Sequence, residues 1–408
     1  MKPYLLALKE RLKGELFFDN LMKSLYATDA SVYRLLPLAI AYPKDNEDLK
    51  ILIQFAEKHK TSLIPRTAGT SLAGQCVGTG IVVDVSKYFN QIVSFNKAAK
   101  TITVQPGVVR DALNNYLEPH GLFFGPNTST SNRCMIGGMV GNNSSGTTSI
   151  QFGVTRDKVK TLRTILSDGS EAVFSAISKE EFHKKTLLPT LEGHIYKSIF
   201  EELISKSVQS EILKEFPKPE IHRRNTGYAL DKLIDSDVFT ISDKRFNMCQ
   251  LLSGSEGTLA FTTEITLQLD ELPPINSALV CLHFESIEFC LQTVETVMQH
   301  DLHTCEMMDK TILDLTKHNK NQQENRQFVA GDPEAILMCE VRANSVSDLL
   351  EQVQKLQEKV TKLGLCYAQV VLKGEHINQA MELRKAGLGL LGNIIGDKKS
   401  APVLKIQQ

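Results

Sequence analysis

The sequence predicts an α+β protein with at least two domains. Its 408 residues exceed a single domain of about 150 residues. Short alternating apolar runs typical of strands recur between segments whose apolar residues have helical spacing, and Pro273-Pro274 interrupts this pattern as a domain boundary would. We therefore expect a helical N-terminal segment over residues 1–30, a first domain over 31–272 and a second domain over 273–408.

The composition excludes several functional classes. The net charge is −1 and no dense run of Lys and Arg is present, which argues against nucleic acid or an anionic membrane as a partner. No apolar run reaches the roughly 20 residues of a transmembrane helix, and residues 1–20 have a charged helical pattern without the apolar stretch of a signal peptide. The eight cysteines form no CxxC pair, which argues against an iron–sulfur cluster or a zinc ribbon within this chain. We expect a cytoplasmic protein, with a peripheral position at the inner membrane as the alternative.

The first domain begins with clear helix and strand signals. Asp45 precedes acidic residues and a run with one apolar face, which predicts that it caps a helix. Apolar residues at 62–65 and 80–85 predict two strands. The polar loop Arg66–Gln75 joins them, and its glycines allow successive backbone N–H groups to face one concavity and bind an anion. An ordinary surface turn is the alternative for this loop.

A second glycine-rich stretch spans residues 125–153. It follows a predicted strand at 100–105 and a helix that should end near Gly121. Its composition fits a flexible linker, a set of tight turns, or backbone that a ligand approaches closely. Linkers of Gly and Ser lack apolar residues. Five apolar side chains interrupt this stretch, namely Ile136, Met139, Val140, Ile150 and Phe152. We therefore expect an ordered ligand cradle.

A hairpin and a helical insertion follow. Asp168-Gly169 lies between two apolar runs and predicts a β-hairpin. Residues 178–240 are charged with a mainly helical pattern, as expected for an insertion over one edge of the domain. This segment contains Arg223, Arg224 and Tyr228 beside a glycine, for which a solvated surface is the alternative to a binding site.

A third glycine-punctuated turn occupies residues 251–259 and leads into a strand at 260–269. The second domain then has the pattern of a ferredoxin-like α+β sheet. Strands are predicted at 278–284, 335–341 and 365–372, and helices at 287–300 and from a capping Ser347 to 363. A last helix should run from Glu375 towards Ile395, before a strand at 402–406. Because that strand meets the end of the chain, we expect the domain to be incomplete at its C-terminus.

The three glycine-bearing stretches together carry a family resemblance. Residues 65–71, 126–153 and 254–259 resemble the FAD-binding module of the vanillyl-alcohol oxidase/p-cresol methylhydroxylase superfamily. Residues 29–34 and 105–108 resemble its branch of D-lactate dehydrogenases, D-2-hydroxyglutarate dehydrogenases and FAD-linked glycolate oxidases. The resemblance implies a two-subdomain FAD-binding module of the p-cresol methylhydroxylase type, followed by a ferredoxin-like cap domain that binds substrate.

The resemblance also implies which residues bind FAD. The first loop would hold the pyrophosphate, the second stretch would flank the isoalloxazine and ribityl chain, and the third would close the site. The implied residues are Pro65, Arg66, Thr67, Ala68, Gly69, Thr70, Ser71, Gln75, Pro126, Thr128, Gly137, Gly138, Gly141, Asn142, Asn143, Ser145, Gly146, Thr147, Gly153, Glu256, Gly257, Thr258 and Leu259. No Rossmann fingerprint is present, so a nicotinamide cofactor is not expected. Ala68, Gly69 and Thr70 stand where some relatives attach flavin through a histidine, which predicts noncovalent FAD.

The implied reaction is the oxidation of a D-2-hydroxy acid such as D-lactate, D-2-hydroxyglutarate or glycolate. Hydride would pass from the substrate Cα to flavin N5, and electrons would leave to a quinone, cytochrome or iron–sulfur acceptor. Arg384 resembles the family arginine that binds the substrate carboxylate, and Tyr228 is a second catalytic candidate. An oxidase of alcohols or sugars and a noncatalytic FAD-binding subunit are the alternatives.

The histidine-rich motifs that supply the metal site and the base in this branch are absent here. The cysteine clusters of the iron–sulfur domain that is fused to some relatives are absent as well. We expect these groups beyond Gln408 or on another subunit. His222, and His303 with Glu306 at i to i+3 spacing, are the remaining candidates, with structural roles as the alternative.

Overall fold

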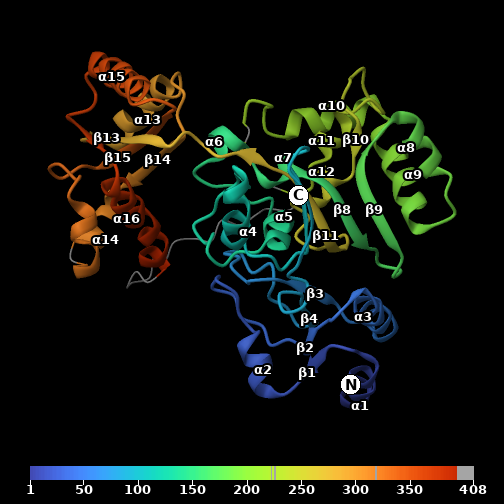
Figure 1. The fold of residues 1–408 in the computed structure, drawn as a ribbon. Helices are drawn as coiled ribbons and strands as arrows, with labels where there is room; N and C mark the ends of the chain where they lie inside the picture. Colours follow the sequence, from blue (N-terminus) through green and yellow to red (C-terminus); the bar gives the residue numbers. More distant parts are fainter. Residues whose placement is uncertain (222, 225–226, 318, 393–408) are drawn as a thin grey trace. The chain divides into compact units, whose positions relative to one another are not determined.

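The computed structural model describes residues 1–221, 223–224, 227–317 and 319–392. Its contacts divide the chain into two compact units. The first unit contains Met1–Ser145 and Gly153–Glu271, and the second contains Gly146–Phe152 and the described residues from Leu272 onward. Figure 1 shows the helices and strands of each unit.

A four-stranded sheet forms the N-terminal half of the first unit, in the order β1-β2-β4-β3. Strands β2, β4 and β3 run parallel, and β1 is antiparallel to β2. The strands are β1 (Glu15–Phe17), β2 (Ala39–Tyr42), β3 (Leu63–Arg66) and β4 (Ile81–Asp84), and the helices are α1 (Lys2–Arg11), α2 (Asn20–Leu25) and α3 (Asn46–His59). The predicted cap of α3 is confirmed, because the Asp45 side chain accepts a hydrogen bond from the Asp48 N–H at 3.1 Å.

Strand β1 was not expected within the N-terminal segment, for which only helix was predicted. Its three residues are too few to show an alternating pattern. The strand forms through its partner, with Glu15 opposite Tyr42 and Phe17 opposite Ile40. Buried Leu16 packs into the same apolar core as Leu49 and Leu52 of α3.

A six-stranded antiparallel sheet forms the second half of the first unit, in the order β10-β9-β8-β11-β6-β5. Its strands are β5 (Ile92–Asn96), β6 (Thr101–Val104), β8 (Val159–Ile165), β9 (Glu171–Ile177), β10 (Phe246–Asn247) and β11 (Phe261–Gln268). The predicted hairpin is confirmed: β8 and β9 pair, and Gly169 takes a φ of +83° in the turn. A short pair, β7 (Leu122–Phe123) and β12 (Asp270–Glu271), lies outside this sheet.

Short helices surround this sheet. They are α4 (Arg110–Leu117), α5 (Ile136–Asn142), α7 (Thr155–Lys158), α8 (Lys179–Thr186), α9 (Leu191–Leu203), α10 (Lys206–Glu215), α11 (Leu230–Ile234) and α12 (Cys249–Leu252). Gly121 takes a left-handed φ of +76° after the last turn that follows α4. Helices α8 to α11 occupy the segment that was predicted to be helical and charged, and buried Phe182 and Tyr196 anchor it in the core.

The second unit is a four-stranded antiparallel sheet in the order β14-β15-β13-β16. Its elements are β13 (Asn276–Phe284), α13 (Ile287–Val297), β14 (Thr304–Asp309), α14 (Lys310–Lys317), β15 (Ala335–Ala343), α15 (Val346–Leu363), β16 (Ala368–Leu372) and α16 (Glu375–Gly392). Helix α6 (Ser149–Phe152) and two 3-10 turns, η2 (Lys320–Gln322) and η3 (Glu324–Arg326), also belong to this unit. This order of strands is that of a ferredoxin-like sheet, which confirms the predicted fold class.

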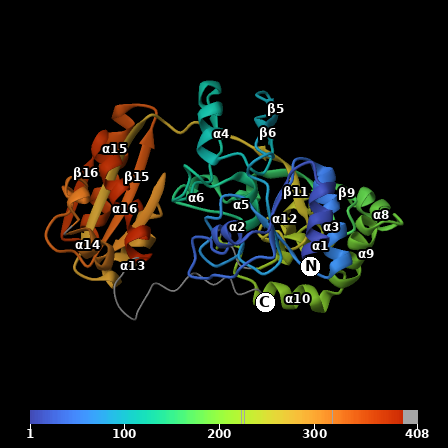
Figure 2. The same cartoon turned by 90° about the horizontal axis from the view of Figure 1, so that it is seen from below.

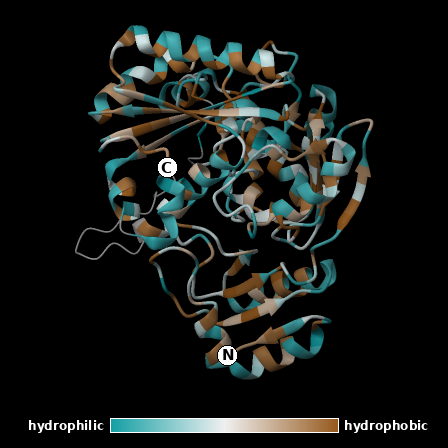
Figure 3. Ribbon diagram, turned by 60° about the vertical axis from the view of Figure 1, so that its left-hand side comes forward, coloured by the Kyte–Doolittle hydropathy of each residue, from teal (hydrophilic) through white to brown (hydrophobic). Residues whose placement is uncertain are grey.

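Each face of this sheet carries its own apolar core. Helices α13 and α15 contribute to one cluster with the sheet, and α14 and α16 contribute to the other; Figure 2 shows the four helices around the strands. The strands carry much of the hydrophobic colour in Figure 3, as expected for a sheet covered on both faces.

Three details of the second unit differ from the prediction. Helix α14 was missed, because no helix was predicted between residues 300 and 335. Strand β14 was missed, because its sequence contains Cys, Glu and Asp as well as apolar residues and shows no simple alternation. The cap of α15 is Ser345 and not Ser347, since the Ser345 hydroxyl accepts from the Asp348 N–H at 3.1 Å. The predicted strand at 402–406 and the end of the last helix lie outside the described residues.

Candidate functional site

The first predicted FAD-binding loop follows β3, and residues of the N-terminal segment hold Arg66 at its start. Arg66 Nη1 donates to the Thr28 carbonyl at 2.8 Å, and its guanidinium lies 5.0 Å from the centre of the Tyr26 ring. Gly69 takes a φ of +64°. Within the described residues, no acceptor pairs with the backbone N–H groups of the segment 67–71. This geometry favours the anion-binding interpretation over an ordinary turn.

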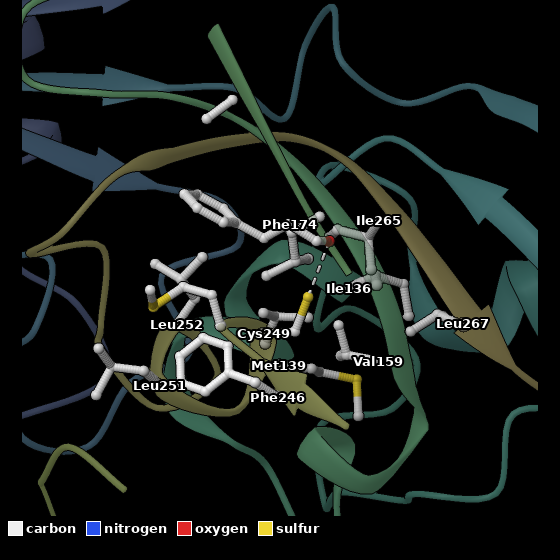
Figure 4. Packing of buried hydrophobic residues seen from close by; sticks show 14 of the residues in the cluster. Ile136, Met139, Val159, Phe174, Phe246, Cys249, Leu251, Leu252, Ile265 and Leu267 are labelled. Atoms are coloured by element: carbon white, nitrogen blue, oxygen red, sulfur yellow. Dashed lines mark hydrogen bonds between the residues drawn. The ribbon is translucent and has the colours of Figure 1, made fainter. Parts of the chain in front are cut away.

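The second stretch is ordered, and an apolar core anchors it. Ile136 and Met139 of α5 lie in the buried cluster with Val159 of β8 (Figure 4). The Gly137 N–H donates to the Pro106 carbonyl at 2.8 Å. A Cβ at Gly137 would lie 3.0 Å from both Cα and O of Pro106, so only glycine fits this approach. The linker interpretation of this stretch is therefore wrong.

The third turn docks on the second by backbone hydrogen bonds. The Gly254 N–H donates to the Val140 carbonyl and the Glu256 N–H donates to the Gly141 carbonyl, each at 2.9 Å. Gly254, Glu256 and Gly257 all have positive φ values, of +98°, +56° and +76°. A left-handed conformation at a glutamate is uncommon, and here the surrounding hydrogen bonds hold it.

The first loop meets both of the others. A Cβ at Gly138 would lie 2.7 Å from Thr67 Oγ1, and a Cβ at Gly257 would lie 2.8 Å from Pro65 Cγ. Gln75 Nε2 donates to Glu256 Oε1 at 3.2 Å. The structure therefore brings the three glycine turns together, although Gln75 of the first turn and Glu256 of the third are 181 residues apart in the sequence. We call the segments 65–75, 137–143 and 254–259 the three-turn cradle.

Buried Arg156, which was not predicted as a site residue, joins the second and third turns of the cradle by hydrogen bonds. Arg156 is only 4% exposed, and its Nε donates to the carbonyls of Gln250 and Ser253 at 2.9 and 3.1 Å. Its Nη2 also donates to the Ser253 carbonyl at 2.5 Å, and its backbone N–H donates to Asn143 Oδ1 at 2.8 Å. Burial lowers the pKa of Arg156 to about 10, which still leaves it charged at neutral pH. No local motif marks such a residue, because the carbonyls that it binds lie 94 and 97 positions away.

Polar atoms left without partners fit a bound cofactor. Gln75 Oε1 and Asn127 Oδ1 are buried and have no hydrogen-bond partner among the described residues. Pro126 and Thr128 flank Asn127: the Pro126 carbonyl accepts from Arg110 Nε at 3.2 Å, and Thr128 Oγ1 lies 3.2 Å from Cys134 Sγ. Together with the unpaired N–H groups of the first loop, these atoms suit a ligand that carries phosphate and polar ring groups.

Other predicted residues of the first unit lie at the cradle or close to it in sequence. Tyr228 lies with its hydroxyl 2.7 Å from Thr258 Oγ1 of the third turn. Ser145 Oγ accepts from Arg223 Nε at 2.9 Å, Gly153 takes a φ of +71°, and Leu259 is partly exposed. Gly146 and Thr147 belong to the second unit. His222 lies outside the described residues.

In the second unit, Arg384 forms an ion pair that the sequence analysis did not foresee. Glu306 Oε2 of β14 accepts from Arg384 Nε at 3.0 Å and from its Nη2. His303 and Glu306 do not form a site with each other. His303 is buried against the Phe152 ring, 5.7 Å between centroids, and burial lowers its pKa.

Neither a metal centre nor a membrane helix emerges from the residues that the structure describes. No three side chains of His, Cys, Asp or Glu gather among them as a ligand set for a metal ion. None of their helices combines the length and apolarity needed to cross a bilayer.

Comparison with protein families assigns both units. Residues 37–175 match the family described as FAD binding domain, and residues 273–406 match the family described as FAD linked oxidases, C-terminal domain. The chain belongs to the FAD-linked oxidases. This confirms the resemblance that the glycine turns carry, and it confirms FAD as the cofactor.

Curated relatives extend over almost the whole chain. The D-2-hydroxyglutarate dehydrogenases of Pantoea ananatis and Escherichia coli are 30% and 31% identical to it, over 93% and 92% of its length. The chain spans only 37% of each of these relatives. The glycolate oxidase subunit GlcD of Bacillus subtilis is 28% identical over 70% of the chain and 61% of the relative.

Solved structures share the fold. p-Cresol methylhydroxylase with substrate bound has a TM-score of 0.64 at 10% identity, over 95% of this chain and 71% of that one. Alkyldihydroxyacetonephosphate synthase also has a TM-score of 0.64, at 14% identity, over 96% of this chain and 64% of that one. At these identities the similarity concerns the fold alone, and it confirms the p-cresol methylhydroxylase type of architecture.

Proposed function

We propose that this chain is the flavin and substrate module of a dehydrogenase that oxidises a D-2-hydroxy acid, with D-lactate, D-2-hydroxyglutarate and glycolate as the candidate substrates. The observation that carries the proposal is the three-turn cradle, in a chain whose FAD-linked relatives are named for these substrates. The bound FAD supplies the hydride acceptor. The chain supplies cofactor binding, substrate orientation and charge.

Several of the predicted residues have surroundings that suit a specific role. The unpaired N–H groups of the segment 67–71 bind the pyrophosphate, and Gly138 and Gly257 let the second and third turns pack closely against Thr67 and Pro65 of the first loop. The cofactor is held noncovalently, because neither histidine nor cysteine occurs at positions 68–70. Arg384 binds the substrate carboxylate, since a guanidinium gives a carboxylate both charge and a fixed orientation. Tyr228 places a hydroxyl beside Thr258 at the cradle.

Further groups complete the reaction from outside the described residues. We propose that the base and its metal ion lie elsewhere in the protein, and that a quinone, a cytochrome or an iron–sulfur domain accepts the electrons. A cytoplasmic location, including the periphery of the inner membrane, agrees with eight cysteines that are all free.

Anaerobic titration of the FAD-loaded protein tests this proposal. The visible absorbance of the oxidised flavin should bleach on addition of at least one of the three D-2-hydroxy acids. The reduced flavin should reoxidise slowly in air and rapidly with a quinone analogue. Rapid reoxidation by oxygen would favour the oxidase alternative, and a flavin that none of the three acids bleaches would favour the noncatalytic one.

A further inference from the structure

The Glu306–Arg384 ion pair connects two elements of the second unit that are far apart in sequence. Glu306 lies on the edge strand β14, and Arg384 lies 78 residues later on α16. The side chains are 14% and 23% exposed, so water screens their attraction only in part. Pairs of this kind are held more firmly than surface ion pairs.

The packing of β14 and α16 sets the position of both residues of the ion pair. Alternate residues of a strand share a face, and Met308, two positions after Glu306, lies in the apolar cluster with Ala380 and Leu383 of α16. Glu306 therefore points towards the side of the sheet that α16 covers. Leu383 is fully buried and directly precedes Arg384, so the backbone of the arginine is anchored in this core.

The pair engages only one edge of the guanidinium. Arginine has five N–H donors on Nε, Nη1 and Nη2. Glu306 Oε2 accepts from Nε and Nη2, and no described residue accepts from Nη1. The edge formed by Nη1 and the second hydrogen of Nη2 retains the geometry for a bidentate contact with another carboxylate.

We propose that Glu306 is a positioning residue: it holds the Nε edge of Arg384 so that the guanidinium presents its Nη edge to the carboxylate of the 2-hydroxy acid. This inference rests on the function proposed above. Without Glu306, the long arginine side chain would sample several rotamers, and each substrate molecule would have to order it on binding. Our proposal therefore predicts weaker carboxylate binding when Glu306 is removed. Electrostatics alone would predict stronger binding, because a negative charge beside the arginine is lost.

Calorimetric titration of the FAD-loaded protein with oxalate, which binds as a carboxylate and cannot be dehydrogenated, separates these views without turnover. We expect Glu306→Ala to weaken oxalate binding at least tenfold, and Glu306→Gln, which keeps one acceptor oxygen, to weaken it less. Glu382→Ala is the matched control, because Glu382 lies on the same helix in an exposed pair with Lys385. It should bind oxalate as the wild type does.

The same titration in an Arg384→Ala background completes a double-mutant cycle. If Glu306 acts through Arg384, Glu306→Ala should have no further effect there. Oxalate binding that is unchanged or tighter in Glu306→Ala and Glu306→Gln would overturn the inference, as would a Glu306→Ala effect of equal size in both backgrounds. A wild-type protein that binds neither oxalate nor any of the three D-2-hydroxy acids would instead contradict the proposed function itself.

Discussion

The two units build their candidate sites by different means. In the first unit, backbone makes the site: three glycine turns meet through N–H to carbonyl bonds and through contacts that a Cβ would block. In the second unit, side chains make it: Glu306 and Arg384 meet because strand and helix cover the same face of a sheet. A backbone site leaves a mark in the sequence as glycines, whereas a side-chain site depends on tertiary pairing.

The largest loss of stability should come from removing Arg156, whose side chain bonds to the backbone of the third turn and of the segment before it. Arg156→Ala would remove the donor to the carbonyls of half-buried Gln250 and buried Ser253 and should cost about 3 kcal/mol of unfolding free energy. Urea unfolding of the FAD-loaded protein measures this loss, and flavin should be released with it. Arg163→Ala, on an exposed side chain, is the control. Equal stability of the two variants would mean that Arg156 does not hold the turns together.

A pH titration should separate the two units. The described histidines whose pKa is lowered by burial are His283, His300 and His303, all in the second unit. In the unfolded chain a histidine has its ordinary pKa of about 6.5, so below this pH the unfolded state binds more protons than the folded state. The stability of the second unit should therefore be fully present above about pH 6.5 and decrease as the pH falls.

Thermal unfolding followed by fluorescence or calorimetry between pH 8 and pH 5 measures this dependence. His283→Gln and His303→Gln should flatten the profile in proportion to the burial of each ring. A wild-type protein whose stability does not decrease on acidification over this range would contradict the buried, neutral histidines of the structure.

The smallest loss of stability is expected at Tyr228, which contacts the cradle through one side-chain hydrogen bond to Thr258. Tyr228→Phe removes the hydroxyl next to Thr258, whose own hydroxyl still donates to the Ser255 carbonyl at 2.6 Å. The loss in stability should be about 1 kcal/mol, with full flavin content. Stopped-flow reduction by the D-2-hydroxy acid then decides its role: we expect a slower reduction step, and an unchanged rate would remove Tyr228 from the catalytic candidates.

Sequence reasoning succeeded where a local rule applied. Glycine at 69, 137 and 257 reports a backbone that must bend or approach closely, and Asp45 reports a helix start. It failed where a distant partner decides the outcome. Strand β1 exists because β2 pairs with it, and the role of Glu306 depends on a helix 78 residues away. Arg156 stands in an ordinary polar context, and only its burial among carbonyls reveals what it does.

Adjacent glycines of α5 give the most direct test of the three-turn cradle. A Cβ at Gly137 meets the Pro106 backbone, so substitution there should damage the fold itself. A Cβ at Gly138 meets only the Thr67 hydroxyl, which can rotate, so the fold should survive while the space beside the first loop is filled.

The deciding measurement is FAD occupancy of Gly138→Val, from the ratio of flavin to protein absorbance after titration of the apoprotein with FAD. The account predicts a folded protein that has lost most of its flavin, with unfolding close to that of wild-type apoprotein. A Gly138→Val protein that binds FAD as fully and as tightly as the wild type would contradict the cradle as the cofactor site.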